Sequence, residues 1–158
     1  VTSGVEIGSG SMMQALPQIV ASELGIEPDK VIVMSADTDA SGRDLGVGGG
    51  RQTVSLGAAS KQACDKVRKK LLDVAGELLQ TDASKLVLSQ GRVEAGGGAG
   101  GSVSLSEVLS RAEATRGPVS GSGAFTAPGV PSMPGCAAGH FIDAIEIHIS
   151  GCHRHWIP

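Results

Sequence analysis

Asp37-Thr38-Asp39-Ala40-Ser41-Gly42-Arg43-Asp44-Leu45-Gly46-Val47-Gly48-Gly49-Gly50-Arg51-Gln52-Thr53 is a polar, glycine-rich stretch between a predicted strand, Val31 to Met34, and the longest predicted helix, Thr53 to about Leu79. The first backbone N–H groups of a helix have no partner inside it, and the helix dipole favours negative charge there. Glycines from residue 46 to residue 50 leave the backbone open to a ligand, and Arg51 adds a forked cationic donor that suits phosphate. The stretch therefore predicts a loop that holds a phosphate-bearing cofactor; a flexible glycine turn with an exposed arginine is the alternative.

A second glycine turn precedes the other predicted helix. Val5-Glu6-Ile7 is typical of a strand end, and Gly8-Ser9-Gly10 is typical of a turn. The helix that follows, Met12 to Leu24, has apolar residues at three- and four-residue steps, with Ser11 as its N-cap and Gly25 at its end. If the starts of the two helices converge, the two turns form one composite polar site.

The long helix is predicted to bury one apolar stripe. Small residues near its start permit close packing against a neighbour: Gly57, Ala58 and Ala59. Its opposite side carries a basic cluster, which we interpret as a solvated face: Lys66, Arg68, Lys69 and Lys70.

The second half of the chain predicts shorter elements. A hairpin is expected from residues 85–88 and 92–95 with Gly91 in the turn, and Ser104 and Glu107 have the spacing of a capping box before a helix from Leu105 to about Ala114. Further strands are expected at residues 119–126 and 140–149, and glycine-rich and proline-rich loops at residues 96–101 and 127–138.

Composition limits the class of protein. The chain has 158 residues, which is one domain or part of a larger one, and its start, Val1-Thr2-Ser3-Gly4, reads as a cut into a longer polypeptide. A net charge of -3 and 2% aromatic residues argue against nucleic acid as a partner. No apolar run approaches the roughly 18 to 20 residues of a membrane helix. Three widely spaced cysteines fit a reducing compartment, so we expect a cytoplasmic protein with no membrane contact.

The order of the motifs resembles the molybdenum-cofactor-binding large subunit of the xanthine dehydrogenase and aldehyde oxidase family. The residues that carry the resemblance are Val5-Glu6-Ile7-Gly8-Ser9-Gly10-Ser11, Gln18 to Ile26, Asp37-Thr38-Asp39 and Gly48-Gly49-Gly50-Arg51-Gln52-Thr53, with a looser match at residues 122–125 and 139–146. The resemblance is close from residue 1 to about residue 80 and patchy to about residue 149.

The resemblance implies an α+β (mixed α/β) fold: a partial molybdopterin-binding domain over residues 1–149 with two glycine turn–helix units, followed by a tail, residues 150–158, that does not match the family. It implies that the turns contact the pterin and its phosphate or cytosine dinucleotide tail. Carried over by position, the cofactor-binding residues are Ile7, Gly8, Ser9, Gly50, Arg51, Gln52 and Thr53.

The sequence also departs from the family pattern. Many members have Gln where this chain has Ser9, and Gly-Ser-Arg where it has Gly49-Gly50-Arg51, so fewer side-chain donors face the cofactor. The region that holds the family's catalytic glutamate is absent, so we nominate no catalytic residue and expect no turnover from the chain alone.

The resemblance implies that the function is that of a segment of a molybdenum hydroxylase, which oxidises an aldehyde or N-heterocycle with oxygen from water. Its partners would be the remaining large-subunit domains and the iron–sulfur and FAD subunits or domains. One alternative is a non-enzymatic remnant that folds, as a homo-oligomer if it stands alone, and binds no cofactor. Another is a site for a different anion, such as a nucleotide.

Metal ligation by the protein itself has little support in the sequence. Cys152-His153-Arg154-His155 is the one metal-like cluster, but adjacent strand residues point to opposite faces and do not share a metal easily. Asp37 and Asp39 lack a calcium-loop pattern and are expected to pin the turn by bonds to the backbone.

Overall fold

The computed structural model describes residues 2–3, 11–35, 51–96, 101–125 and 143–149. The elements, in chain order, are β1 (Thr2–Ser3), α1 (Ser11–Leu24), η1 (Pro28–Lys30), β2 (Met34–Ser35), α2 (Arg51–Leu79), η2 (Ala83–Lys85), β3 (Leu86–Ser89), β4 (Arg92–Ala95), β5 (Ser102–Ser104), α3 (Leu105–Arg116), β6 (Val119–Phe125) and β7 (Asp143–Ile149). The mixed helix-and-strand fold expected from the sequence is confirmed.

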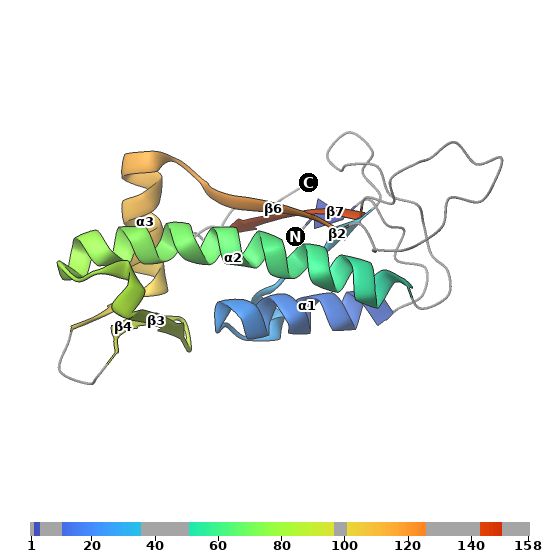
Figure 1. The fold of residues 1–158 in the computed structure, drawn as a ribbon, viewed down its shortest axis with the longest axis horizontal. Coiled ribbons are helices and arrows are strands. Elements are labelled where there is room, and N and C mark those ends of the chain that lie inside the picture. The colour runs from blue at the N-terminus through green and yellow to red at the C-terminus, as the bar shows by residue number, and fades with distance from the viewer. Residues whose placement is uncertain (1, 4–10, 36–50, 97–100, 126–142, 150–158) are drawn as a thin grey trace.

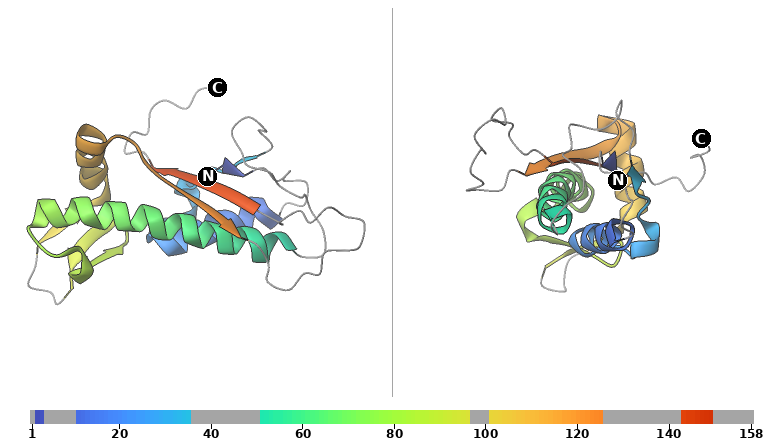
Figure 2. Two further views of the ribbon diagram at one scale, coloured as in Figure 1. Left: turned by 45° about the horizontal axis from the view of Figure 1, so that its top comes forward. Right: turned by 90° about the vertical axis from the view of Figure 1, so that its right-hand side faces the viewer.

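The long helix α2 is the axis of the molecule, as Figure 1 shows. The described strands form two sheets that pack along it: a four-stranded sheet in the order β2-β1-β7-β6 and a three-stranded antiparallel sheet in the order β3-β4-β5. The four-stranded sheet and α1 lie toward the first half of α2, whereas α3 and the small sheet lie at its other end (Figures 1 and 2).

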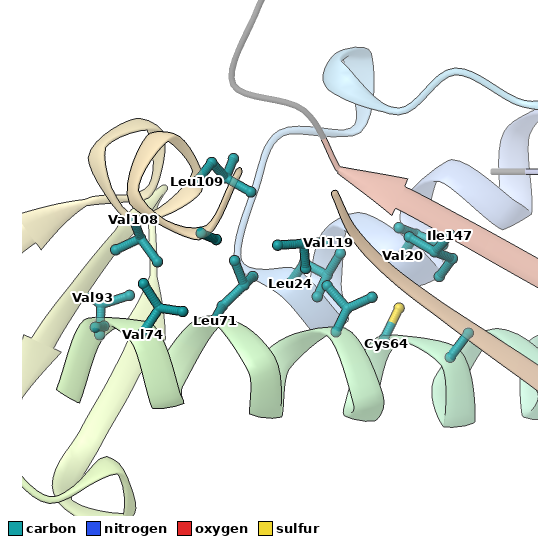
Figure 3. Close-up of a cluster of buried hydrophobic side chains, with 14 of the residues drawn as sticks. Val20, Leu24, Cys64, Leu71, Val74, Val93, Val108, Leu109, Val119 and Ile147 are labelled. Atoms are coloured by element: carbon teal, nitrogen blue, oxygen red, sulfur yellow. The ribbon is translucent and has the colours of Figure 1, made fainter. Parts of the chain in front are cut away.

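One apolar cluster joins these elements around α2. Fully buried side chains of α2, spaced three or four residues apart, make up its centre: Leu56, Ala59, Ala63, Val67, Leu71 and Val74. Val20 and Leu24 from α1, Val108 from α3, Val119 from β6 and Ile147 from β7 pack against them (Figure 3). The apolar stripe predicted for the long helix is therefore confirmed in its central turns, although Val54 and Leu78 near its ends are exposed.

Strand β6 lies unusually close to α2 because it carries glycine where its alternate residues face the helix. A Cβ atom on Gly121 would lie 2.5 Å from the carbonyl oxygen of Ala63, and one on Gly123 would overlap the carbonyl oxygen of Ala59. Both distances are shorter than real Cβ contacts, so only glycine fits at these two positions.

Several local predictions are confirmed. Helix α1 ends in a Schellman motif, with Gly25 at φ +61° and the N–H of Ile26 donating to the carbonyl of Ala21 at 3.0 Å. The hairpin β3–β4 turns at Gln90-Gly91, and both residues have positive φ. At the start of α3 the hydroxyl of Ser104 accepts from the N–H of Glu107 at 3.3 Å, which is one half of the predicted capping box.

Other predictions need correction. Helix α1 begins at Ser11, so Ser11 is its first helical residue instead of its N-cap. The strand predicted at Val31–Met34 is reduced to β2, two residues long and paired in parallel with β1. Ile32 is 67% exposed and Met34 is 44% exposed, so this apolar run is not buried on both faces as predicted. The predicted strand at residues 5–7, the loop at residues 36–50 and the proline-rich loop lie outside the described residues.

Candidate cofactor site at the paired helix starts

The two glycine-preceded helices pack side by side and run in the same direction. Ile19 of α1 meets Gly57 of α2, where a Cβ on the glycine would lie 3.4 Å from Cδ1 of the isoleucine. Four residues further along both helices, Glu23 forms an ion pair with Lys61, with 3.6 Å between Oε1 and Nζ. Contacts that advance by the same number of residues on both helices require parallel axes.

The parallel packing brings the two helix starts to the same end of the molecule. Ile19 is eight residues after the start of α1 at Ser11, and Gly57 is six residues after the start of α2 at Arg51, so the two starts are nearly level. Figures 1 and 2 show both starts at one end, where they face the viewer in the right-hand view of Figure 2. The convergence that the sequence left open is therefore present in the structure.

The charges of the two described first turns favour an anion. Neither α1 nor α2 has an acidic residue in its first turn, so no carboxylate of either first turn compensates the positive end of the helix dipole. The N–H groups of both first turns are the donors that a helix leaves unpaired. Two such starts side by side can bind one extended anionic group, such as a phosphate or pyrophosphate, through backbone donors.

The predicted site residues are only partly within the described structure. Ile7, Gly8, Ser9 and Gly50 lie outside the described residues. Arg51, Gln52 and Thr53 form the first turn of α2, two residues earlier than the predicted helix start, and Thr53 is exposed. The N–H groups of this first turn stand at a helix start, where a helix leaves its backbone donors without a partner.

An ion-pair network, which sequence reasoning did not identify, helps to hold the two helices together. Glu23 lies between Lys61 and Arg68, with 3.4 Å between its Oε2 and Nη2 of the arginine, and Arg68 also reaches Asp65 at 3.9 Å. Partly exposed pairs of this kind contribute about 0.2–1 kcal/mol each, so the apolar contacts beneath them dominate. No local sequence signal connects Glu23 to residues about 40 positions away.

Cys64 is buried beside this interface and is not a reactive group. Its side chain is fully buried, and burial, reinforced by the nearby charge of Glu23, raises the pKa of the thiol to about 12. A neutral, inaccessible thiol neither attacks a substrate nor ligates a metal readily. Within the described ranges no group of three or more His, Cys, Asp or Glu side chains is placed to hold a metal ion. Cys136 and the Cys152-His153 cluster lie outside those ranges.

No helix among the described residues is both long enough and apolar enough to cross a lipid bilayer.

Comparison with known proteins identifies the family. Residues 1–150 match the family model of the molybdopterin cofactor-binding domain. The 6-hydroxypseudooxynicotine dehydrogenase complex subunit gamma of Paenarthrobacter nicotinovorans is 33% identical over 137 residues, which is 87% of this chain and 16% of the relative. The carbon monoxide dehydrogenase large chain of Afipia carboxidovorans is 35% identical over 69 residues, which is 44% of this chain and 8% of the relative.

Solved structures agree with this assignment. A Cu,Mo-CO dehydrogenase in the carbon monoxide-reduced state matches with a TM-score of 0.62 and 26% identity, over 68% of this chain and 14% of that one. Quinoline 2-oxidoreductase from Pseudomonas putida 86 shares the fold, with a TM-score of 0.63 at 21% identity over 93% of this chain and 17% of that one. This chain thus corresponds to less than one fifth of the length of these relatives. With the sequence motifs, the fold and the family model in agreement, the chain belongs to the molybdopterin cofactor-binding domain family, within the xanthine dehydrogenase and aldehyde oxidase group of molybdenum enzymes.

Proposed function

We propose that this chain is a cofactor-holding segment of a molybdenum hydroxylase that oxidises an aldehyde or N-heterocycle with oxygen from water. The observation that carries the proposal is the parallel packing of α1 and α2, with both starts at one end and no acidic residue in either first turn. The donors of these two turns fit the anionic part of a molybdopterin cofactor, so the family assignment and the local chemistry agree.

The residues that would hold the cofactor are Ile7, Gly8, Ser9, Gly50, Arg51, Gln52 and Thr53. Their role is binding and orientation: backbone N–H groups and short hydroxyls hold the phosphate or dinucleotide end, and Arg51 adds a charged donor. The molybdenum centre supplies the redox chemistry when bound. We assign no proton-transfer step to this chain, because no carboxylate of its described residues lies in the first turns of α1 or α2.

The proposal extends to the organisation of the whole enzyme. Relatives are named as a complex subunit gamma, a large chain and a large subunit, which supports partner subunits here as well. We propose that the partners are the remaining large-subunit domains with iron–sulfur and FAD subunits, in the cytoplasm. We also propose a domain boundary after residue 149, with residues 150–158 outside the cofactor-binding unit.

The test is the molybdenum and pterin content of the chain purified from a host that makes the cofactor, together with any subunits that co-elute. Arg51→Glu is expected to lower both contents at least tenfold, because it places a carboxylate at the start of α2. Arg111→Glu makes the same charge change at an exposed position of α3, at the other end of α2, and should leave both contents unchanged.

The non-enzymatic remnant makes the opposite prediction. A wild-type chain that folds but carries neither metal nor pterin, from a host whose other molybdenum enzymes are loaded, would overturn the proposed function. Equal loss of cofactor in the Arg51→Glu and Arg111→Glu variants would show that the start of α2 has no specific role in binding the cofactor.

A further inference from the structure

Among the described strands, β6 lies at one edge of the four-stranded sheet. Among the described strands it pairs only with β7, from Val119 opposite Ile149 to Phe125 opposite Asp143. An edge strand exposes N–H and C=O groups that can pair with another chain. Strand β6 has small residues at its centre, in the sequence Val-Ser-Gly-Ser-Gly-Ala-Phe. Its side chains therefore do little to fix the register in which a further strand could pair with it.

Two lysines of α2 bind the carbonyl groups of this strand. Nζ of Lys66 donates to the carbonyl oxygen of Ser122 at 2.6 Å, and Nζ of Lys70 donates to that of Ser120 at 2.7 Å. Residues two apart point their carbonyl groups to the same side of a strand. Strand β7 occupies one side of β6. The two lysines, whose side chains are exposed, therefore reach the carbonyl groups from the opposite side, which we call the open side.

The spacing of the two elements explains why both bonds form together. Four residues of helix rise about 6 Å, and two residues of strand rise about 6.8 Å, so Lys66 and Lys70 match Ser122 and Ser120 when helix and strand run in opposite directions. The glycine contacts follow the same step, with Gly123 on Ala59 and Gly121 on Ala63. The close glycine packing therefore sets the register that places the two ammonium groups at the edge.

We propose that Lys66 and Lys70 form a clamp on the edge of β6 that faces away from β7, and that the partner it excludes is β6 of a second copy of this chain. Two copies of β6 can pair antiparallel about a two-fold axis, where each copy contributes the same backbone groups. The clamp opposes this pairing in two ways: it occupies two edge carbonyl groups, and it brings two positive charges of each copy against those of the other.

A neighbouring lysine provides a matched control. Lys69 lines the same shallow cavity of about 450 Å³ between α2 and β6, but among the described residues its ammonium group has no hydrogen bond or ion pair. Removing Lys69 lowers the local charge without releasing a strand carbonyl. The effect of removing Lys69 on self-association therefore reports the general positive potential of this face, and a larger effect of removing Lys66 and Lys70 reports their bonds to the strand.

The experiment is sedimentation velocity of the full chain over a range of concentrations. The variant Lys66→Ala/Lys70→Ala is compared with Lys69→Ala/Lys30→Ala, which has the same net charge. Alanine is the best helix former, so α2 is kept, and circular dichroism checks that it is. The clamp variant is expected to self-associate with a Kd at least tenfold lower than that of the control.

A third substitution tests whether the association uses the edge. The N–H of Ser122 points to the open side together with its carbonyl, so Ser122→Pro removes an edge donor and leaves the β6–β7 ladder in place. Added to the clamp variant, it should return the Kd to that of the control. Equal Kd values for clamp and control variants, or association that persists with Ser122→Pro, would overturn the proposal.

Discussion

At the scale of single residues, Gly123 is the described glycine that has the least room for a Cβ atom. A side chain there would overlap the carbonyl oxygen of Ala59 in the first half of α2, and backbone atoms cannot move aside as a flexible side chain can. We expect Gly123→Ala to lower the free energy of unfolding by about 3 kcal/mol, at the upper end of overpacking costs. Urea denaturation measures the change. Ser122→Ala, one residue away and exposed, should change it by less than about 0.5 kcal/mol, and similar losses in both variants would contradict this packing.

The buried thiol of Cys64 makes a prediction about pH. Its pKa is raised from 9.0 to about 12 in the folded chain, so the thiol stays neutral when folded and ionises near pH 9 when unfolded. The stabilisation from burying it is complete below pH 9 and declines as pH rises from 9 toward 12, because the unfolded state then binds fewer protons. Cys64→Ala should flatten this alkaline decline in urea titrations.

The same burial predicts slow chemical modification of Cys64. In a Cys136→Ser/Cys152→Ser background, a thiol reagent should modify Cys64 only at the rate at which the fold opens, and denaturant should accelerate the reaction. Modification as fast as that of a free thiol in native buffer would show that Cys64 is accessible.

At the scale of elements, a substitution at the start of α2 can distinguish an effect on helix stability from an effect on cofactor binding. Thr53→Asp places a carboxylate in the first turn, which should stabilise the helix by about 0.3–1 kcal/mol and at the same time repel the anionic end of the cofactor. The expected result is unchanged or higher thermal stability with lower molybdenum and pterin content. Ser106→Asp in the first turn of α3 is the control, because it makes the same change without altering the paired starts. A parallel loss of stability and cofactor would point to simple misfolding.

The elements also show which features could be predicted from the sequence. Helices α1, α2 and α3 and the β3–β4 hairpin were predicted because their signals are local: apolar steps, Gly25, the cap at Ser104 and the Gln90-Gly91 turn. The strand expected at Val31–Met34 was wrong because an apolar run alone does not show whether anything covers it, and here Ile32 and Met34 remain exposed.

Long-range contacts lay beyond sequence reasoning for a different reason. The basic cluster of α2 was interpreted as a solvated face, yet Lys66 and Lys70 bind carbonyls about 50 residues further along the chain. The spacing of lysines along a helix does not indicate which strand their side chains will contact. The convergence of the two helix starts likewise has no local sequence signal, because it follows from apolar packing between α1 and α2.

At the scale of the whole molecule, the proposed function gives the exposed apolar side chains a role as contacts for the remaining domains of the large subunit. Met13 and Val54 are 48% and 64% exposed near the starts of α1 and α2, and Ile32 and Met34 are exposed along and just before β2, the other edge strand of the described sheet. The chain covers only 14–17% of the solved structures that it resembles. On the proposed function, the remaining domains of its own large subunit would cover such surfaces.

This leads to a prediction about assembly. Ile32→Ser/Met34→Ser should lower the free energy of unfolding of the chain by no more than about 1 kcal/mol, because Ile32 keeps 67% and Met34 keeps 44% of its surface exposed in the chain itself. The same variant should reduce co-purification with the remaining large-subunit domains at least fivefold, since burying each side chain at an interface would contribute about 1.5–3 kcal/mol. Val87→Ser on β3 is the control: Val87 is 56% exposed at the opposite end of the molecule from the helix starts. If the double variant unfolds more easily but still co-purifies, Ile32 and Met34 support this fold instead of forming its interface.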